Sequence, residues 1–356
     1  MFNIEPIVAK SKQSCIMIAG PCVAESQEQL VETASSLLAK SEIDLFRCGV
    51  WKPRSSPNNF EGYGLKALSW LQEIQATYQV PVCIEIASAY HLEKALNHGI
   101  KTFWIGARTT VNPFLVQAIA DASKGCDISI MIKNPIAPDL NLWIGAFERF
   151  AKANIQRLAA IHRGFSTYEL SIYRNNPLWS IPIELKRLHP EIPIICDPSH
   201  IAGDKKHIAE VAQKALYLAA DGLMIEVHHA PNQALSDKQQ QLSPYEYQKL
   251  INELYFSSTT TLEDIELRKL REQIDELDKD LCCLLSKRFD VVREIAAYKK
   301  EKNMSLLQIN RWKELLNTIL NICEAKKIDK VFMQKIMEII HEESIQLQEK
   351  IIKENT

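Results

Sequence analysis

A histidine at the end of a short apolar run is the first residue in this sequence that suggests chemistry. Residues 193–196 form an isoleucine-rich run typical of a buried strand, and the polar turn from Asp197 to His200 follows directly. In folds of alternating strands and helices, reactive groups gather just past the carboxyl ends of the strands. A single histidine is more often structural, so the interpretation depends on whether other strands end in the same way.

The same pattern recurs along the first 250 or so residues. Short apolar or β-branched runs alternate with stretches of helical period, such as 26–40 and 205–220. The runs span residues 15–19, 45–50, 80–86, 102–105, 128–132, 158–161, 192–196 and 222–227. Eight such alternations favour an α/β fold of the (β/α)8 TIM barrel type over a doubly wound sheet. The sequence has no GxGxxG after the first run and no P-loop, which argues against the nucleotide-binding folds.

Each run carries, or is followed by, a titratable or cationic residue, and in a barrel these residues would share one face. One set combines a thiol, an imidazole and two carboxylates from four separate loops: Cys22, His200, Glu226 and Asp237. A mixed set of nitrogen, oxygen and sulfur ligands suits a divalent transition metal and suits magnesium or calcium poorly. A buried thiol beside unrelated surface groups is equally compatible with the spacing alone.

The second set is cationic and consists of Arg47, Lys52, Arg54, Arg108, Lys133 and Arg163. Six positive charges at one barrel mouth would repel one another unless anions neutralise them. In a chain of net charge −2 they therefore predict a ligand with several phosphate and carboxylate groups. Solvated surface charges would account for one or two of these residues.

The composition limits the class of protein. A chain of 356 residues exceeds most single cores and predicts two domains. The net charge of −2 argues against a nucleic-acid or membrane-surface binder, and no run approaches 18 apolar residues. The N-terminus lacks the features of a secretory signal. Nine cysteines without CxxC pairs indicate reduced thiols and a cytoplasmic location.

Eight motifs extend this interpretation. In order, residues 12–253 contain AGPC, FRCGVWKPRSSP, EIA, IGARTT, MIKN, HRG, DPSH and MIEVHHAPNQALSD. This set resembles the metal-dependent type I 3-deoxy-D-arabino-heptulosonate 7-phosphate (DAHP) synthases, which begin the shikimate pathway of aromatic amino-acid biosynthesis. The related 3-deoxy-D-manno-octulosonate 8-phosphate synthases read K-A-N-R-T-S where this chain reads KPRSS from Lys52. The KPR form favours erythrose 4-phosphate, and Ser55 keeps the hydroxyl of the more usual threonine.

The resemblance implies a role for each candidate. Cys22, His200, Glu226 and Asp237 would bind one divalent transition metal of the Mn, Fe, Co or Zn class. Phosphoenolpyruvate would be held by Arg47, Lys52, Arg108, Lys133 and Arg163, with Glu85 nearby, and Arg54 and Ser55 would hold the aldehyde's phosphate. The metal would polarise the aldehyde, the enol carbon would attack it, water would add, and phosphate would leave. Lys52 is the candidate proton donor to the new alkoxide, and a lysine among five other cations is expected to have a depressed pKa.

The composition changes after Tyr255. Residues 256–261 form a polar linker, and glycine and proline are absent from 262 onward. We therefore expect a barrel domain over 1–255 and an all-helical domain over 262–356, with helices over 262–301, 307–325 and 330–352. The first helix would be ~60 Å long, which favours pairing with a second copy of the chain. A plain oligomerisation bundle is the alternative interpretation of this domain.

Polar residues on these helices indicate more than oligomerisation. Arg288 and Lys299 are eleven positions apart, which places them about 20° from one helical face. Ser344 and Gln348 share a face of the third helix, and with Arg311 they would complete a cationic pocket. Arg271 points in a different direction from Arg288, as if it served another site.

The segments 270–300 and 339–348 resemble the all-helical chorismate mutases. The resemblance implies a three-helix domain in an intertwined homodimer, in which Arg271 reaches the partner's site. Arginines would hold the two carboxylates of chorismate, and Lys299 and Gln348 would donate to the ether oxygen during rearrangement to prephenate. Gln348 needs no proton for this role, which predicts activity near neutral pH. Gln308 and Trp312 replace the usual aspartate and glutamate, so the contacts with the substrate hydroxyl are expected to differ.

The sequence therefore favours a bifunctional DAHP synthase and chorismate mutase. One alternative is that the helical domain only dimerises the chain and binds an effector, and another is an octulosonate synthase. The first strand begins near residue 15, so no N-terminal regulatory domain is expected. Feedback control would then act through the helical domain. Association beyond the homodimer, the native metal and the effector are not encoded in the sequence.

Overall fold

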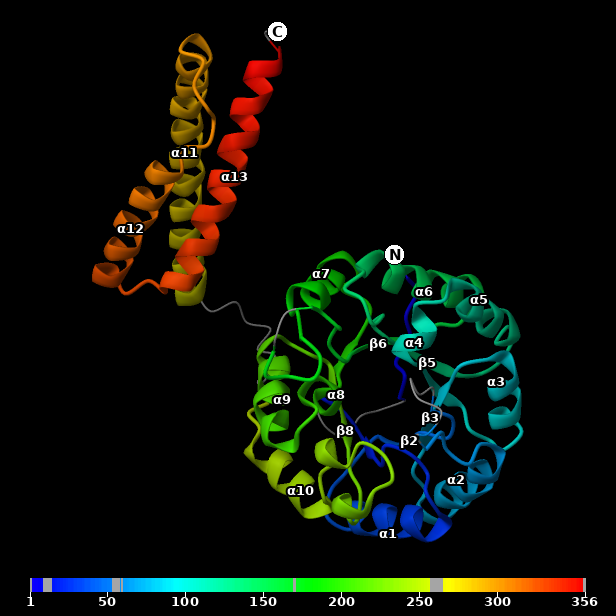
Figure 1. The fold of residues 1–356 in the computed structure, drawn as a ribbon. Coiled ribbons are helices and arrows are strands. Elements are labelled where there is room, and N and C mark those ends of the chain that lie inside the picture. The colour runs from blue at the N-terminus through cyan, green and yellow to red at the C-terminus, as the bar shows by residue number, and fades with distance from the viewer. Residues whose placement is uncertain are drawn as a thin grey trace. The chain divides into compact units, whose positions relative to one another are not determined.

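The computed structural model describes residues 2–8, 15–52, 58, 60–168, 171–256 and 265–354. The chain divides into two compact units, Met1–Ser258 and Thr259–Thr356. The first unit is a closed barrel of parallel strands with helices around it, and the second consists of helices (Figure 1). The predicted fold class, a TIM barrel followed by an all-helical region, is confirmed.

The strands pair in chain order, and β8 closes the barrel against β1. Their bounds are β1 (Ile16–Gly20), β2 (Leu45–Cys48), β3 (Val82–Ile86), β4 (Thr102–Ile105), β5 (Ser129–Lys133), β6 (Arg157–His162), β7 (Ile194–Cys196) and β8 (Gly222–Glu226). Each predicted run overlaps one strand and agrees with its bounds to within two residues. β3 and β7 begin two residues later than the runs because Pro81 and Pro193 have no N–H for strand pairing.

Helices cover the outside of the barrel (Figure 1). They are α1 (Gln27–Leu38), α2 (Leu65–Tyr78), α3 (Ala89–Leu96), α4 (Ala107–Thr110), α5 (Pro113–Ala122), α6 (Leu140–Lys152), α7 (Ser180–Leu188), α8 (Pro198–Ala202), α9 (Ile208–Tyr217) and α10 (Pro244–Glu253), with 3-10 turns η1 (Lys205–His207), η2 (Pro231–Gln233) and η3 (Lys238–Gln240). Their starts follow from capping chemistry. Ser26, Ser88 and Asn112, for example, accept hydrogen bonds from the first-turn backbone of α1, α3 and α5.

The alternation of side chains along the strands produces two apolar layers. One layer, including Ile18, Met131 and Met224, fills the inside of the barrel. The other, including Phe46 and Ile84, packs between the strands and the helices. The charged side chains Arg47, Glu85, Lys133 and Glu226 lie at or near the carboxyl ends of β2, β3, β5 and β8 and are buried. The barrel thus has an apolar interior and a charged carboxyl-terminal mouth.

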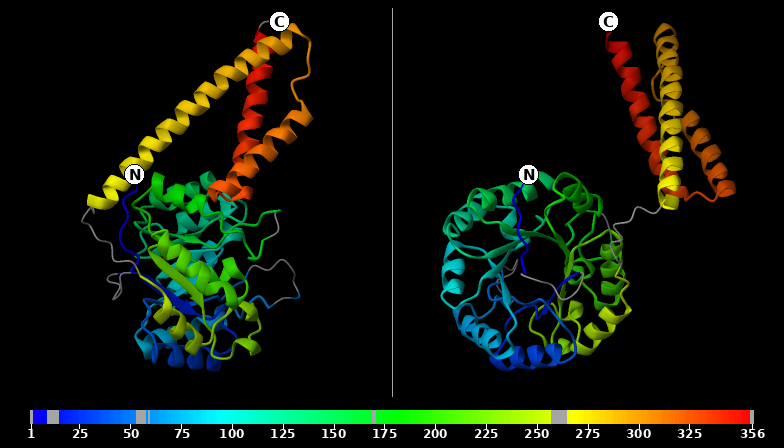
Figure 2. Two further views of the ribbon diagram at one scale, coloured as in Figure 1. Left: turned by 90° about the vertical axis from the view of Figure 1, so that its left-hand side faces the viewer. Right: turned by 180° about the vertical axis from the view of Figure 1, so that it is seen from behind.

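The helical unit contains α11 (Ile265–Glu301), α12 (Ile309–Lys326) and α13 (Lys330–Glu354), close to the expected ranges. α13 packs against both α11 and α12 (Figure 2). It runs in the same direction as α11, because Arg288 meets Ser344 and Lys300 meets Ile352. Val292, Ala296 and Cys323 are buried in this unit. Among the described residues, no helix has the length and hydropathy to cross a membrane.

Candidate functional site

Cys22 and Asp237 form the first pair of metal-ligand candidates at the barrel mouth. Cys22 follows β1, and its Sγ lies 3.3 Å from Asp237 Oδ2 and 3.2 Å from Ser236 Oγ. Gly20, which ends β1, lets this strand end lie close against β2: its φ is +149°, and a Cβ there would lie 2.2 Å from the Arg47 carbonyl oxygen. Burial raises the pKa of the Cys22 thiol to about 12, and Glu226 adds to this effect. Binding of a metal would therefore release the thiol proton.

His200 and Glu226 form the second pair. Asp197 caps α8 by accepting from the His200 backbone N–H at 3.1 Å, and its Oδ2 also lies 2.8 Å from His200 Nδ1. This contact occupies Nδ1 and leaves Nε2, which lies 3.8 Å from Glu226 Oε1. Gln240 Nε2 donates to the other Glu226 oxygen at 2.8 Å. The imidazole is thus oriented by a carboxylate, as metal-binding histidines usually are.

The two pairs are linked through Arg174 and Gln240. Arg174 donates to both Asp237 and Gln240, at 2.9 Å and 2.8 Å, and Gln240 in turn contacts Glu226. In the part of the chain that the structure describes, no three His, Cys, Asp or Glu side chains converge closely enough to hold an ion. The donor set still fits a transition metal, since it combines nitrogen, oxygen and sulfur ligands, and Glu226 Oε1, although ion-paired with Arg47, makes no well-formed hydrogen bond to a described residue.

Arg47 and Lys133 flank a tryptophan that the sequence analysis did not single out. The Arg47 guanidinium lies 3.0 Å from Glu226 Oε1 and 5.1 Å from the centroid of the Trp104 ring. Lys133 Nζ lies 2.9 Å from Asp197 and 5.7 Å from the same centroid. Trp104 Nε1 donates to Glu85 at 3.2 Å. The indole therefore lies within cation–π distance of two buried cations and donates a hydrogen bond to a carboxylate.

Lys52 contradicts the expectation of a depressed pKa. Burial lowers the pKa of Lys52, but the nearby Cys22, Glu85 and Glu226 outweigh burial and raise it. Of the two lysines Lys52 and Lys133 at the mouth, Lys133 is the one with a lowered pKa, because burial and the cations Arg47 and Lys52 outweigh Asp197. The expectation was wrong because it counted the cations of the mouth and left out the acids.

Arg163, which follows β6, is held in place by hydrogen bonds to two asparagines. Its backbone N–H donates to Asn134 Oδ1, and its Nη1 donates to Asn175 Oδ1, both at 2.8 Å. Burial lowers the pKa of Arg163 to about 10. The charge of Asp197 raises this pKa, and the charge of Arg108 lowers it further. Arg108 is exposed on α4. Arg54 and Ser55 lie outside the described residues.

Several site residues were missed in the sequence: Trp104, Asn134, Asn175, Arg174, Asp197 as a positioning group, and Gln240. A signal existed for two of them. Trp104 occupies a position in β4 whose side chain points into the barrel. Asp197 stands three residues before His200 at the start of a helix, where an aspartate often caps the backbone. For the others, the partner is far away in the sequence and no local pattern marks it.

In the helical unit, a polar cluster lies between α11 and α13. Arg288 Nη1 donates to Ser344 Oγ at 2.6 Å, and Gln348 Nε2 donates to the Ser344 carbonyl at 3.0 Å. Lys299 donates to the Leu306 carbonyl at 2.5 Å and is buried, as are Ser344 and Gln348. Burial lowers the pKa values of Arg288 and Lys299. Three of the predicted helical residues, Arg288, Ser344 and Gln348, are therefore linked by hydrogen bonds, and Lys299, like Arg288, lies close enough to His341 to lower the pKa of that imidazole.

Arg311 and Arg271 lie apart from this cluster in the single chain. Arg311 is exposed on α12 and lies 3.6 Å from Glu314, so the structure does not place it in the expected pocket. The next residue, Trp312, takes that direction instead and stacks on His341 with ring centroids 4.2 Å apart. His341 Nε2 is buried without a hydrogen bond to any described residue, and its pKa is lowered by burial, Arg288 and Lys299. Arg271 is exposed on the first half of α11.

Comparisons with known proteins agree with this geometry. The family model of the DAHP synthetase I family matches residues 3–261, and that of chorismate mutase type II matches residues 270–349. A phospho-2-dehydro-3-deoxyheptonate aldolase of Thermotoga maritima is 30% identical over 238 residues, which cover 67% of this chain and 68% of the relative. A 2-dehydro-3-deoxyphosphooctonate aldolase of Wolinella succinogenes is 26% identical over 274 residues, covering 67% and 97%.

Solved structures give the same result. A crystal structure of the Thermotoga maritima DAHP synthase aligns with a TM-score of 0.59 and 28% identity, over 67% of each chain. A truncated form of the 3-deoxy-D-arabino-heptulosonate 7-phosphate synthase from that organism also has a TM-score of 0.59, with 25% identity over 76% of this chain and 94% of that one. With a barrel mouth of this composition and a helical unit of the second family, the chain belongs to the DAHP synthetase I family and is a bifunctional enzyme that joins a DAHP synthase domain to a chorismate mutase domain.

Proposed function

We propose that the barrel condenses phosphoenolpyruvate with D-erythrose 4-phosphate and water to give DAHP and phosphate, the first step of the shikimate pathway. The observation that carries this proposal is the charged mouth, where Arg47, Lys133 and Arg163 surround the Cys22 and His200 pairs. Cations in a partly dehydrated site favour a substrate with phosphate and carboxylate groups.

Phosphoenolpyruvate is bound by the cations Arg47, Lys52, Arg108, Lys133 and Arg163, with Glu85 nearby. Arg54 and Ser55 bind the phosphate of the aldehyde, on the strength of the KPRSS motif alone. The raised pKa of Lys52 keeps it protonated at neutral pH, which suits a donor of a proton to the new alkoxide. The acids of the mouth that raise this pKa are therefore part of the proposed mechanism.

Cys22, His200, Glu226 and Asp237 are the residues that would hold one divalent transition metal of the Mn, Fe, Co or Zn class. When bound, such a metal supplies Lewis-acid chemistry at the aldehyde oxygen. Asp197 fixes the His200 ring so that Nε2 faces the metal site. The cations neutralise the substrate charges while the enol carbon attacks the aldehyde carbon. Water then adds to the resulting cationic carbon, and phosphate leaves by C–O cleavage.

The choice of aldehyde can be tested directly, because the comparisons include both heptonate and octonate aldolases. The metal-loaded enzyme would be given equal concentrations of erythrose 4-phosphate and arabinose 5-phosphate with phosphoenolpyruvate. We expect the seven-carbon product to dominate, because this chain carries the KPR motif. A predominance of the eight-carbon product would assign the chain to the octulosonate synthases. Full turnover after exhaustive chelation would contradict the metal site.

We infer that the helical unit rearranges chorismate to prephenate. Arg288 supplies a cation for a substrate carboxylate, and Lys299 and Gln348 supply donors for the ether oxygen. Gln348 Oε1 and His341 Nε2 are both buried without hydrogen bonds to described residues, as expected in a site that awaits a ligand. Trp312 stacks on His341 where the family has a glutamate, so the substrate hydroxyl would meet an imidazole.

A homodimer through α11 is part of this proposal. Apolar side chains repeat along α11 with spacings of three and four, apart from one step of seven in which Arg288 takes the intervening position, and each is between 42% and 66% exposed: Leu267, Leu270, Ile274, Leu277, Leu281, Leu284, Val291, Ile295 and Tyr298. We call this row the α11 stripe. Such a heptad pattern is typical of a helix that pairs with another helix. A second copy would cover the α11 stripe and bring Arg271 to the partner's cluster.

The mutase proposal competes with a helical unit that only dimerises the chain. Chorismate turnover by the wild type and by Arg288→Ala distinguishes the two. We expect the variant to lose nearly all turnover, because it loses the cation that Ser344 positions. Equal background rates in both proteins would leave the helical unit as a dimerising and effector-binding module.

We further propose that prephenate or chorismate, bound to the helical unit, inhibits the barrel. The support is the fusion of the two domains in one chain. Arg288→Ala should then keep the uninhibited synthase rate and lose inhibition by prephenate. Unchanged inhibition in this variant would reject the proposal.

The nine free cysteines, six of them buried, support a reducing compartment such as the cytoplasm.

A further inference from the structure

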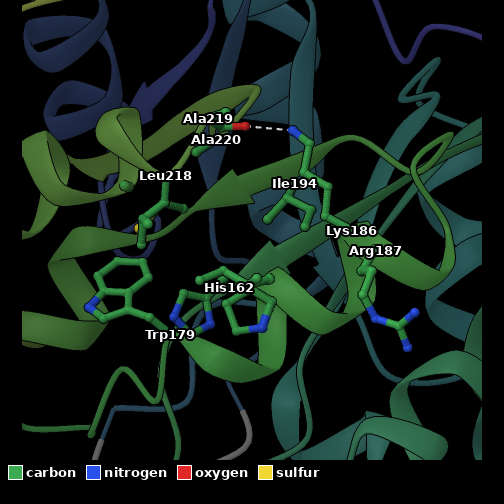
Figure 3. Close-up of a pocket in the computed structure, with 12 residues that line it drawn as sticks. His162, Trp179, Lys186, Arg187, Ile194, Leu218, Ala219 and Ala220 are labelled. Carbon is green, nitrogen blue, oxygen red and sulfur yellow. Dashed lines mark hydrogen bonds between the residues drawn. The ribbon is translucent and has the colours of Figure 1, made fainter. Parts of the chain in front are cut away.

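A cavity of about 290 Å³ lies in the barrel wall, outside the proposed active site. It is formed by α7, the strands β6 and β7, and the carboxyl end of α9 with the residues that follow it (Figure 3). None of the metal-ligand candidates or the cationic set lines it. Its volume is nearly twice that of an engineered cavity of about 150 Å³ that binds benzene.

The walls of the cavity are mainly apolar. Trp179, Pro182, Ile183, Ile194 and Leu218 are among its lining residues. This lining favours a flat, apolar ligand body.

Two cations at the rim are already neutralised. Lys186 Nζ donates to the Ala219 carbonyl at 2.5 Å and to Asp221 at 3.0 Å (Figure 3). Arg187 makes two hydrogen bonds to Glu184, at 2.7 Å and 2.6 Å. Because both charges have partners, the cavity offers no free cation to a strongly anionic ligand. An uncharged ligand fits it better.

His162 is the polar group inside the cavity. Its side chain is 1% exposed and its ring lies edge-on to Trp179, with centroids 5.0 Å apart. Neither ring nitrogen makes a well-formed hydrogen bond to a described residue, although the Pro177 backbone interacts weakly with the ring. Burial holds the pKa of His162 down to about 3, so the ring is neutral and presents one donor and one acceptor. Buried polar groups of this kind normally have a partner.

Strand geometry explains why His162 points into this cavity. Side chains of β6 alternate between the barrel interior, where Ala159 and Ile161 pack, and the helical layer, where Leu158 and Ala160 pack. His162 continues the second series. The unsatisfied imidazole therefore belongs to the wall of the barrel and has no role in the proposed synthase chemistry.

We propose that this cavity binds a small uncharged aromatic molecule carrying one hydroxyl or ring N–H group, which hydrogen-bonds to His162. The apolar walls accept the ring, and the imidazole gives the site its chemical preference. An ordered water on His162 is the competing explanation of the unsatisfied nitrogens.

Phenol and benzene are matched probes for this proposal. Their binding to the full chain would be measured by ligand-observed NMR, and phenol would be located by soaking crystals. We expect phenol to bind roughly tenfold more tightly than benzene, the effect of one buried hydrogen bond. In His162→Phe the two probes should bind equally. Equal binding in the wild type, or density for water alone at His162 in soaked crystals, would overturn the proposal.

A second pair of variants does not depend on the folding of His162→Phe. Leu218→Trp fills the cavity from its rim and should abolish the binding of both probes. Tyr217→Trp changes the adjacent residue, which is 65% exposed and does not line the cavity, and should bind as the wild type does. Retained phenol binding in Leu218→Trp would place the probe elsewhere on the molecule and reject the site.

Discussion

Asp197 connects the two halves of the synthase site. One carboxylate orients His200, pairs with Lys133 at 2.9 Å and caps α8. Opposite charges on His200 and Lys133 outweigh burial and hold the pKa of Asp197 well below its ordinary value. The residue thus stays ionised in a fully buried position, where it positions a metal-ligand candidate and a cation together.

Asp197→Asn is expected to separate these tasks. Asparagine caps a helix as well as aspartate does, so α8 should persist. Loss of the charge that orients the imidazole should weaken metal affinity about 10- to 100-fold and lower synthase kcat. Metal titration and steady-state rates measure both effects. Asp204→Asn, at the exposed cap of η1, is the matched control and should change neither. Equal metal affinity in Asp197→Asn would contradict the positioning role.

His162 leads to a prediction about pH and stability. In the folded chain its ring stays neutral down to about pH 3, whereas an unfolded chain takes up a proton near pH 6.5. The unfolded state therefore binds more protons between these values, and this residue's contribution to stability is complete above pH 6.5 and falls below it.

His162→Phe removes that dependence. Relative to the variant, the wild type should lose about 1 kcal/mol of unfolding free energy between pH 6.5 and 5.5, and the loss approaches about 1.4 kcal/mol per pH unit at lower pH. Urea denaturation of both proteins at pH 7.5, 6.5 and 5.5 measures the difference, which cancels the titration of other groups. Asp197 and Arg163 act on the ring with opposite signs and are unchanged in the variant. A difference that stays constant across this range would show that the ring already titrates normally.

At the scale of elements, the sequence predicted the strands well because a buried parallel strand is a local apolar run. Each of the eight runs matches its strand to within two residues at either end, and the late starts after Pro81 and Pro193 follow from the missing N–H. The residues at the strand ends were also predictable from a barrel's geometry. Their partners were not, because the pairs Arg47–Glu226 and Lys133–Asp197 join strands far apart in the sequence.

The same reason explains the two expectations that failed. The Lys52 pKa is raised by acids from other strands, which no local pattern reveals. On α12, the adjacent residues Arg311 and Trp312 point in different directions around the helix axis. Trp312 stacks on His341, and Arg311 is exposed beside Glu314. Helical period predicts the face of an element to within about one residue, which is too coarse to choose between neighbours.

The α11 stripe predicts the effect of a single charge. Leu277→Glu places a carboxylate in the middle of the stripe, where a helix–helix contact would bury it. We expect the helical unit to lose self-association and the mutase activity to fall with it. Sedimentation and chorismate turnover measure the two results. Ser286→Glu adds the same charge to an exposed position on the opposite side of α11 from the stripe and should leave both unchanged. A Leu277→Glu protein that associates as the wild type does would reject the stripe as an interface.

At the scale of the whole molecule, the two units differ in whether their buried cations are paired with carboxylates. The barrel pairs Arg47 and Lys133 with its own acids. In the helical unit, no carboxylate among the described residues pairs with Arg288 or Lys299, and burial lowers the pKa of each. The helical site therefore depends on an anionic ligand, or on a second copy of the chain, to balance its charge.

Subunit mixing tests whether each mutase site is built from two copies. Arg271 lies seventeen residues before Arg288 on α11, about 26 Å along the helix axis, so one chain cannot bring both to the same cluster. Arg271→Ala and Arg288→Ala should each be inactive as homodimers. In a mixed dimer, one site has both changes and the other has neither.

Random reassociation of the two inactive variants in equal amounts should therefore restore about one quarter of wild-type chorismate turnover, because half of the dimers are mixed and one site in each is intact. Mixing without dissociation, or mixing two preparations of Arg288→Ala, supplies the control and should restore nothing. If the proposed interface is correct but Arg271 has no role, the single Arg271→Ala variant stays active. If each site belongs to one chain, mixing two inactive variants never restores activity, because no exchange of subunits can join Arg271 and Arg288 in one site.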